Sequence, residues 1–76
     1  MASELEIQQH LLQFLKGVSQ LHEFEDWLVP VLWDLAESED VAARELAGHI
    51  HNLIAEASRG DRTYRSMRES MSSQVA

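Results

Sequence analysis

The apolar residues of this chain recur every three to four positions along most of its length, which is the spacing of one face of an α-helix. No segment shows the alternation of apolar and polar residues that is typical of a half-buried strand. Glycines and capping residues divide the pattern into four segments. The sequence therefore predicts an all-α protein, a small three- to four-helix bundle with helices over about 4–16, 20–37, 39–58 and 63–71.

Polar residues and a glycine mark the ends of the first helix and the start of the second. Ser3 and Glu6 have the spacing of a capping box, which predicts that the first helix begins there. Gly17 can take the left-handed conformation that ends a helix, and Ser19 is expected to cap the second helix. The apolar face expected for the first helix consists of Ile7, Leu11, Phe14, Leu15 and Val18.

The third and fourth helices carry similar signals. Ser38, followed by two acidic residues, predicts the start of the third helix, and Gly60 its end. Asp61 or Thr63 is expected to cap a short fourth helix. The inner faces are expected to hold Ala43, Leu46, Ile50, Leu53, Ile54 and Ala57, then Tyr64, Met67 and Met71. This gives one up-and-down helical domain over residues 1–71 and a frayed tail over 72–76.

The second helix has two apolar faces when its residues are placed about 100° apart, with Trp27 as zero. The face expected to enter the core holds Trp27, Phe24, Leu28, Val31 and Leu35, extended by Leu21 and Leu32. Val29 and Trp33 lie outside it, near 200° and 240°, one turn apart. They form a second strip that one small bundle does not need for its core.

Pro30 leaves the position of Trp33 open at this point. Proline has no N–H and its ring clashes with the carbonyl four residues earlier, so it is expected to kink the helix or to start a new one. A bend there would turn Trp33 inward beneath the fourth helix, against Tyr64 or Met67. Without such a bend, Trp33 is exposed in a binding patch of the kind on which interfaces concentrate their energy.

Leu5 and Leu12 lie off the main apolar face of the first helix and form another thin strip. Together with Val29 and Trp33 they amount to more apolar surface than one bundle covers. The sequence therefore predicts a protein partner, either a second copy of the chain or a different protein.

Charge is unevenly distributed along these 76 residues, whose net charge is −7. Residues 1–40 hold nine acidic residues and one lysine, whereas residues 41–76 hold five arginines and four acidic residues. The field of the first half favours a basic partner and repels nucleic acid. One basic cluster, Arg59, Arg62, Arg65 and Arg68, is expected either to contact phosphate or an acidic partner, or to lie over the acidic helices and beside Tyr64 and Met67.

No leader or membrane signal is found in the chain. The beginning lacks a basic segment followed by an apolar one, and no apolar run reaches the roughly 18 residues of a membrane span. With no cysteine there is neither a disulfide nor a thiolate metal site. We therefore expect a soluble, cytoplasmic protein without membrane contact.

The residues that could carry catalysis do not form a familiar motif. His49 and His51 are two apart on a helix and point in different directions, and the His/acid pairs at four-residue spacing lack a third ligand. The serines occupy caps and the tail, and no glycine-rich loop is present to hold phosphate. We expect no enzyme activity, metal or cofactor; the alternative is an enzyme whose site forms between protomers from His10, His22 or His49.

The segment FLKGVSQLHEFEDWL, residues 14–28, resembles the helix–glycine–serine–helix hairpin of small helical bacterial proteins of the colicin-immunity type. The resemblance implies an acidic inhibitor that covers a basic toxin surface, with Glu23, Glu25 and Asp26 as candidate contacts. The function expected is thus that of a non-catalytic, acidic interaction module that binds a basic protein; the alternative is a homodimeric structural or regulatory subunit. Candidate partner-binding residues are Val29, Trp33, Glu23, Glu25, Asp26 and Leu12.

Overall fold

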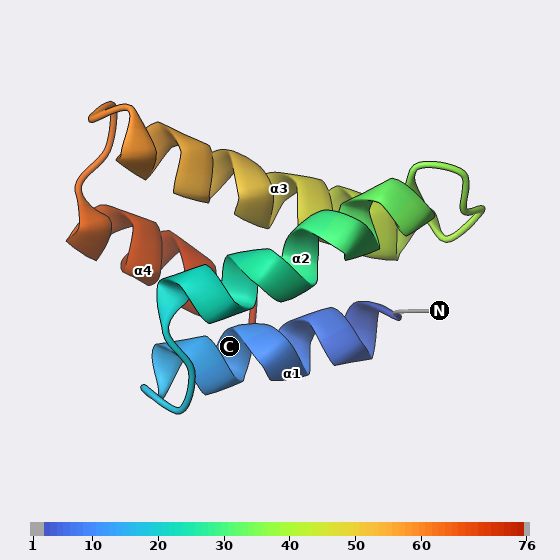
Figure 1. Ribbon diagram of the computed structural model, residues 1–76, viewed down its shortest axis with the longest axis horizontal. Helices are drawn as coiled ribbons and strands as arrows, with labels where there is room; N and C mark the ends of the chain where they lie inside the picture. The colour runs from blue at the N-terminus through green and yellow to red at the C-terminus, as the bar shows by residue number, and fades with distance from the viewer. Residues whose placement is uncertain (1–2, 76) are drawn as a thin grey trace.

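A computed structural model describes residues 3–75 of the chain, and these fold into helices joined by short turns. The helices, in chain order, are α1 (Glu4–Leu15), α2 (Leu21–Leu35), α3 (Val41–Ser58) and α4 (Tyr64–Ser72) (Figure 1). No strand occurs among the residues described. The prediction of a small all-α bundle is confirmed, and each observed boundary lies within two residues of the expected one.

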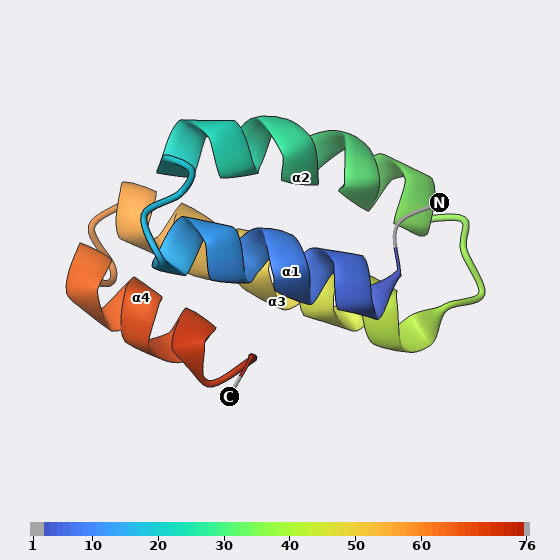
Figure 2. The same cartoon turned by 90° about the horizontal axis from the view of Figure 1, so that it is seen from below.

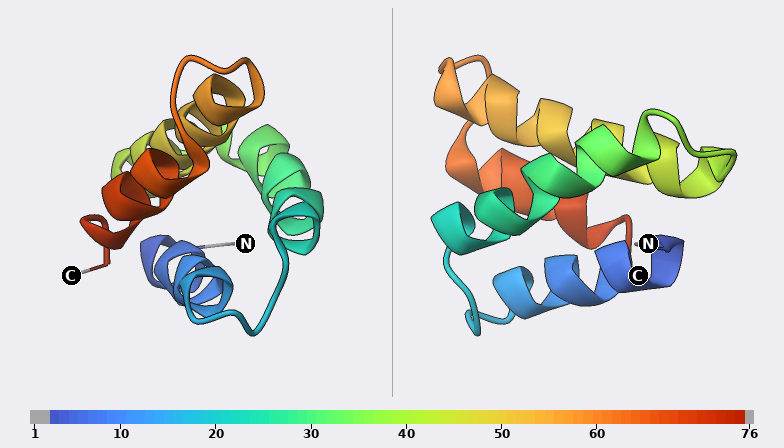
Figure 3. Two further views of the ribbon diagram at one scale, coloured as in Figure 1. Left: turned by 90° about the vertical axis from the view of Figure 1, so that its left-hand side faces the viewer. Right: turned by 45° about the vertical axis from the view of Figure 1, so that its right-hand side comes forward.

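Successive helices run in alternating directions, so the bundle is of the up-and-down kind (Figures 1 and 2). Helices α1 and α3 each contact all the other helices, whereas α2 packs only against α1 and α3 within the described chain. Seen along the bundle, α2 and α4 lie on opposite sides of the core (Figure 3). One side of α2 is therefore left without a neighbouring helix.

The core is built from one apolar face of each helix. Its buried residues are Ile7, Leu11, Phe14, Phe24, Leu28, Val31, Leu35, Ala43, Ala47, Ile50, Leu53, Ile54, Met67 and Met71. Most of these were expected from helical spacing. The assignment of Val18 to the inner face of the first helix was wrong, because Val18 follows Gly17 in the turn, where helical spacing no longer applies, and its side chain is exposed.

The helix caps confirm some of the predicted cap residues and correct others. Ser3 Oγ accepts a hydrogen bond from the Glu6 N–H, and Thr63, rather than Asp61, caps α4. The expected cap at Ser19 was wrong, since α2 is capped at Gln20, whose N–H donates to Glu23 Oε1 over 2.9 Å. The expected cap at Ser38 was also wrong because Asp40, two residues later, accepts from the Ala43 N–H and begins α3.

Two glycines end helices as predicted. Gly17 and Gly60 both have a φ of +82°, a left-handed conformation in which a Cβ is strained. Carbonyls near the ends of α1 and α3, among them those of Gln13 and Glu56, accept hydrogen bonds from N–H groups of these turns.

Pro30 lies inside α2 and does not start a new helix there. The helix runs as one element from Leu21 to Leu35 and curves gently along its length (Figure 2). Pro30 is exposed, so its ring and the carbonyl that lacks an N–H donor are on the solvent side. The helical register is therefore kept from Trp27 to Trp33.

The C-terminal segment returns to the bundle after α4 ends at Ser72. The Gln74 N–H donates to the carbonyl of Met71, and Val75 packs partly buried against the core. The side-chain Nε2 of Gln8 on α1 donates to the Gln74 carbonyl over 3.4 Å. Within the segment expected to fray, Gln74 therefore contacts α1 and Val75 contacts the core, while residue 76 lies outside the described residues.

None of the helices found in residues 3–75 combines the length and apolar character that a membrane-spanning helix needs.

Candidate functional site

The side of α2 that faces away from the core presents an exposed apolar strip. Trp33 is 76% exposed and Val29 is 40% exposed, and they are one helical turn apart. The core residues of the same helix, among them Leu28 and Leu35, point to the opposite side. Of the two positions that the sequence left open for Trp33, the structure shows the exposed one.

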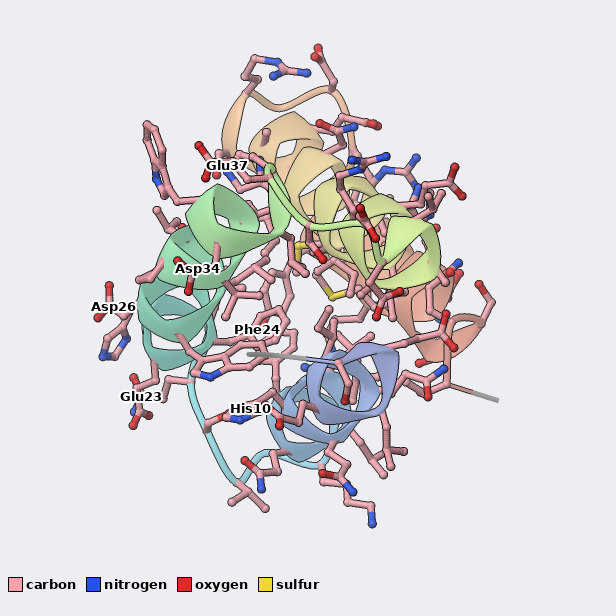
Figure 4. All side chains as sticks on the ribbon, turned by 90° about the vertical axis from the view of Figure 1, so that its right-hand side faces the viewer. His10, Glu23, Phe24, Asp26, Asp34 and Glu37 are labelled. Atoms are coloured by element: carbon pink, nitrogen blue, oxygen red, sulfur yellow. The ribbon has the colours of Figure 1, made fainter. Side chains whose placement is uncertain are left out.

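The second tryptophan of α2 has a different environment. Trp27 is partly buried and packs against the core. Its ring stacks on the imidazole of His10 from α1, with centroids 3.7 Å apart and planes within 8° of parallel. Figure 4 shows His10 beside the α1–α2 interface and Phe24 pointing into the bundle. Trp27 therefore has a structural role, joining two helices, that Trp33 lacks.

Acidic side chains surround the exposed strip. Asp26 and Glu37 continue the row of Val29 and Trp33 at its two ends, and Glu23 and Asp34 lie along one flank. All four residues are exposed, and Figure 4 shows Glu23 and Asp26 pointing away from the bundle. We call the row Asp26, Val29, Pro30, Trp33 and Glu37 the α2 outer face.

The negative charge of this surface is not compensated inside the chain. Ion pairs within the described residues occur only between arginines 59, 62 and 65 and acidic residues 56, 61 and 69. None of the nine acidic residues of the first 40 positions takes part in an ion pair within residues 3–75. The α2 outer face thus combines an apolar centre with a negative electrostatic field.

Two of the predicted contact residues lie elsewhere. Glu25 is partly buried and lines a different hollow, an open groove of about 590 Å³ shared with Tyr64 and Arg68 of α4. Leu12 is 39% exposed and lines a smaller hollow of about 200 Å³ with Leu5, Gln8, Gln9 and Val75. The candidate contact residues that the sequence predicted as one set therefore lie on three different surfaces of the fold.

The arginine cluster is used within the bundle. Arg62 joins α3 to α4, since its Nε lies 3.1 Å from Glu56 Oε2 and its Nη1 donates to the hydroxyls of Ser66 and Ser70. Arg59 pairs with Asp61 and Arg65 with Glu69. The arginines make these ion pairs with acids close in sequence, not with those of the first two helices.

Arg68 makes the contacts expected of an arginine lying over aromatic rings. Its Nη2 donates to the carbonyl of Leu15 over 2.7 Å, near the C-terminal end of α1. The guanidinium carbon lies 5.2 Å from the ring centre of Phe14 and 5.9 Å from that of Tyr64. Arg68 thereby links α4 to α1 and satisfies a carbonyl that α1 leaves unpaired.

No group of three or more histidines or acidic residues within residues 3–75 is arranged to hold a metal ion. His10 is stacked on Trp27, while His22, His49 and His51 are exposed. His49 lines a third open hollow with Glu45 and Glu4, of about 460 Å³. These three hollows are open, and Ser19, His22 and Glu25 are among the residues that line the one of about 590 Å³.

Sequence reasoning missed part of the α2 outer face. Asp34 and Glu37 were counted as acidic residues but not as neighbours of Trp33, although position 37 is one turn beyond position 33. The same angular placement that singled out Val29 and Trp33 would have found them. The stacking of His10 on Trp27 had no comparable signal, because it depends on the packing of α1 against α2.

Comparison of the chain with protein-family models, with curated proteins and with solved structures finds no match.

Proposed function

We propose that this protein is a non-catalytic interaction module whose α2 outer face binds a basic surface of another protein. The observation that carries the proposal is a tryptophan 76% exposed between uncompensated acidic residues, on a side of α2 that no other described helix covers. An exposed aromatic anchor supplies binding energy, and the surrounding charge selects and steers a basic partner.

An inhibitor of the immunity type is one form of this function. The resemblance of residues 14–28 to small helical immunity proteins supports it, as do the net charge of −7 and the exposed Glu23 and Asp26 of α2. Such an inhibitor acts by covering a basic surface, which requires no reacting group of its own.

A homodimer through Val29 and Trp33 is the alternative, and charge argues against it. A twofold dimer brings identical surfaces together. If the two α2 helices run parallel, Asp26 faces Asp26; if they run antiparallel, Asp26 faces the Glu37 end of the other copy. Either arrangement places like charges in contact, which costs free energy.

Comparative affinity capture from an extract of the organism that encodes the chain tests the proposal. The immobilised full chain, the variant Trp33→Ser and the control variant Asn52→Ser, which changes an exposed residue of α3, are exposed to the same extract. We expect one basic protein to be retained by the chain and by Asn52→Ser, to be lost from Trp33→Ser, and to elute as salt rises.

The proposal would be contradicted if Trp33→Ser retained the same proteins as the unchanged chain, or if the retained protein resisted salt. Retention of only further copies of the chain would favour the homodimer instead.

A further inference from the structure

The α2 outer face has a fixed order of groups along the helix axis. Asp26, Val29, Trp33 and Glu37 follow one another at spacings of three, four and four residues, so acidic groups stand at both ends and apolar groups in the middle. At a rise of 1.5 Å per residue, the helical part of the row from Asp26 to Trp33 is about 10 Å long. Asp26, Val29 and Trp33 lie within α2, which Pro30 does not interrupt, and Glu37 lies in the turn two residues beyond the end of the helix.

Resting on the proposed function, we infer that the partner segment is a basic amphipathic α-helix that lies along this row. A stripe with spacings of three and four residues is the contact that one helix presents to another. The complementary stripe has a basic residue, two apolar residues and a second basic residue, spaced by three or four positions.

The surroundings of α2 leave room for such a helix. Within the described chain α2 packs only on α1 and α3, both on its inner side. A partner axis 8–10 Å away, the usual distance between packed helices, would place apolar side chains on Val29 and Trp33. Its basic ends would then lie near Asp26 and Glu37, and Glu23 and Asp34 would extend the acidic surface along one flank.

Charge complementarity makes a basic helix a better occupant than a second copy of the chain. Each copy carries a net charge of −7, and its arginines 59, 62 and 65 already pair with its own acids. Asp26 and Glu37 have no ion pair among the described residues, so a basic partner gains their attraction without breaking an existing pair.

Two synthetic peptides of roughly 18 residues, long enough to form a helix, test the inference by calorimetric titration of the full chain. The first peptide presents Lys, Leu, Leu and Lys in one row at spacings of four, three and four. The control peptide has the same composition with Leu at the ends and Lys in the middle. We expect the first peptide to bind at least tenfold more tightly than the control.

Variants of the protein locate the binding site. We expect Trp33→Ser to weaken binding of the first peptide at least tenfold, because it removes the central anchor. The double variant Asp26→Asn, Glu37→Gln should weaken it about three- to tenfold, since each end loses one charge pair. Asn52→Ser on α3 should bind like the unchanged chain.

Equal affinity for the two peptides, no binding of either, or binding that Trp33→Ser leaves unchanged would overturn the inference. The affinity capture separates this failure from that of the proposed function. If capture still depends on Trp33 while the peptides fail, the α2 outer face holds a partner of another shape. If capture does not depend on Trp33, the proposed function itself falls.

Discussion

At the scale of single residues, the two tryptophans of α2 show how angular position decides role. They are six residues apart, which on a helix is about 240° of rotation. Trp27 therefore reaches the α1 interface and stacks on His10, whereas Trp33 points away from the bundle. The same residue type is a structural element at one position and an available binding anchor at the other.

Replacing each tryptophan in turn separates these roles. Trp33→Ser is expected to change the free energy of unfolding by no more than about 0.5 kcal/mol, as for most surface positions. Trp27→Ser is expected to cost about 2 kcal/mol or more, because it removes buried apolar area and the stacked ring. Urea unfolding followed by circular dichroism measures both, and a loss of several kcal/mol in Trp33→Ser would place that residue in the core.

The stacked pair itself can be measured by a double-mutant cycle. His10→Ala, Trp27→Ala and the double variant should give a coupling energy of about 0.5–1.5 kcal/mol. His51→Ala, at an exposed position of α3, should show coupling to Trp27→Ala near zero. A His10 coupling no larger than that of His51 would mean that the ring contact contributes nothing to stability.

At the scale of elements, glycines determine where α1 and α3 stop and therefore how α2 and α4 are placed. Gly17 and Gly60 adopt left-handed conformations, whereas Gly48 lies inside α3 with a helical backbone and open space where a Cβ would be. A methyl group is thus unfavourable at the first two positions and favourable at the third.

Gly17→Ala is expected to lower the free energy of unfolding by about 1–2 kcal/mol, the cost of a left-handed residue with a side chain. Gly48→Ala is expected to raise it by about 0.5–1 kcal/mol, because alanine is the better helix former and a Cβ there meets no atom within 4 Å. Thermal and urea unfolding of both variants measures these two changes in the free energy of unfolding. The same sign of change in both would show that backbone conformation is not the deciding factor.

Element positions could be predicted from the sequence because periodic apolar residues and the Gly17 and Gly60 stops are local signals. The cap residues were harder to predict, because several polar residues before each helix can serve as the N-cap. In the structure Gln20 and Asp40 cap α2 and α3, in place of the expected Ser19 and Ser38. The role of Pro30 depended on whether α2 would continue through it. That outcome rests on packing against α1 and α3, which no short segment reveals.

At the scale of the whole molecule, the fold sorts charge as well as apolar area. Arginines 59, 62 and 65 pair with nearby acids, and Arg68 lies over aromatic rings. Arg44 donates to the carbonyl of Ser38. The acidic residues of the first 40 positions have no ion pair in the described structure. The candidate site could be predicted only in part. Val29, Trp33, Glu23 and Asp26 are all exposed on α2. Glu25 is on the same helix but lines the groove shared with α4, and Leu12 lines a hollow beside α1, because of how the helices pack.

The central claim, that the α2 outer face binds a basic protein, is tested most directly by site-specific photo-crosslinking in the host. A benzoylphenylalanine at position 33 and, as control, at exposed position 52 on α3, is activated by light, and the adducts are identified by mass spectrometry. We predict an adduct with one basic protein from position 33 and none from position 52. Adducts only with a second copy of the chain, or the same adducts from both positions, would contradict the claim.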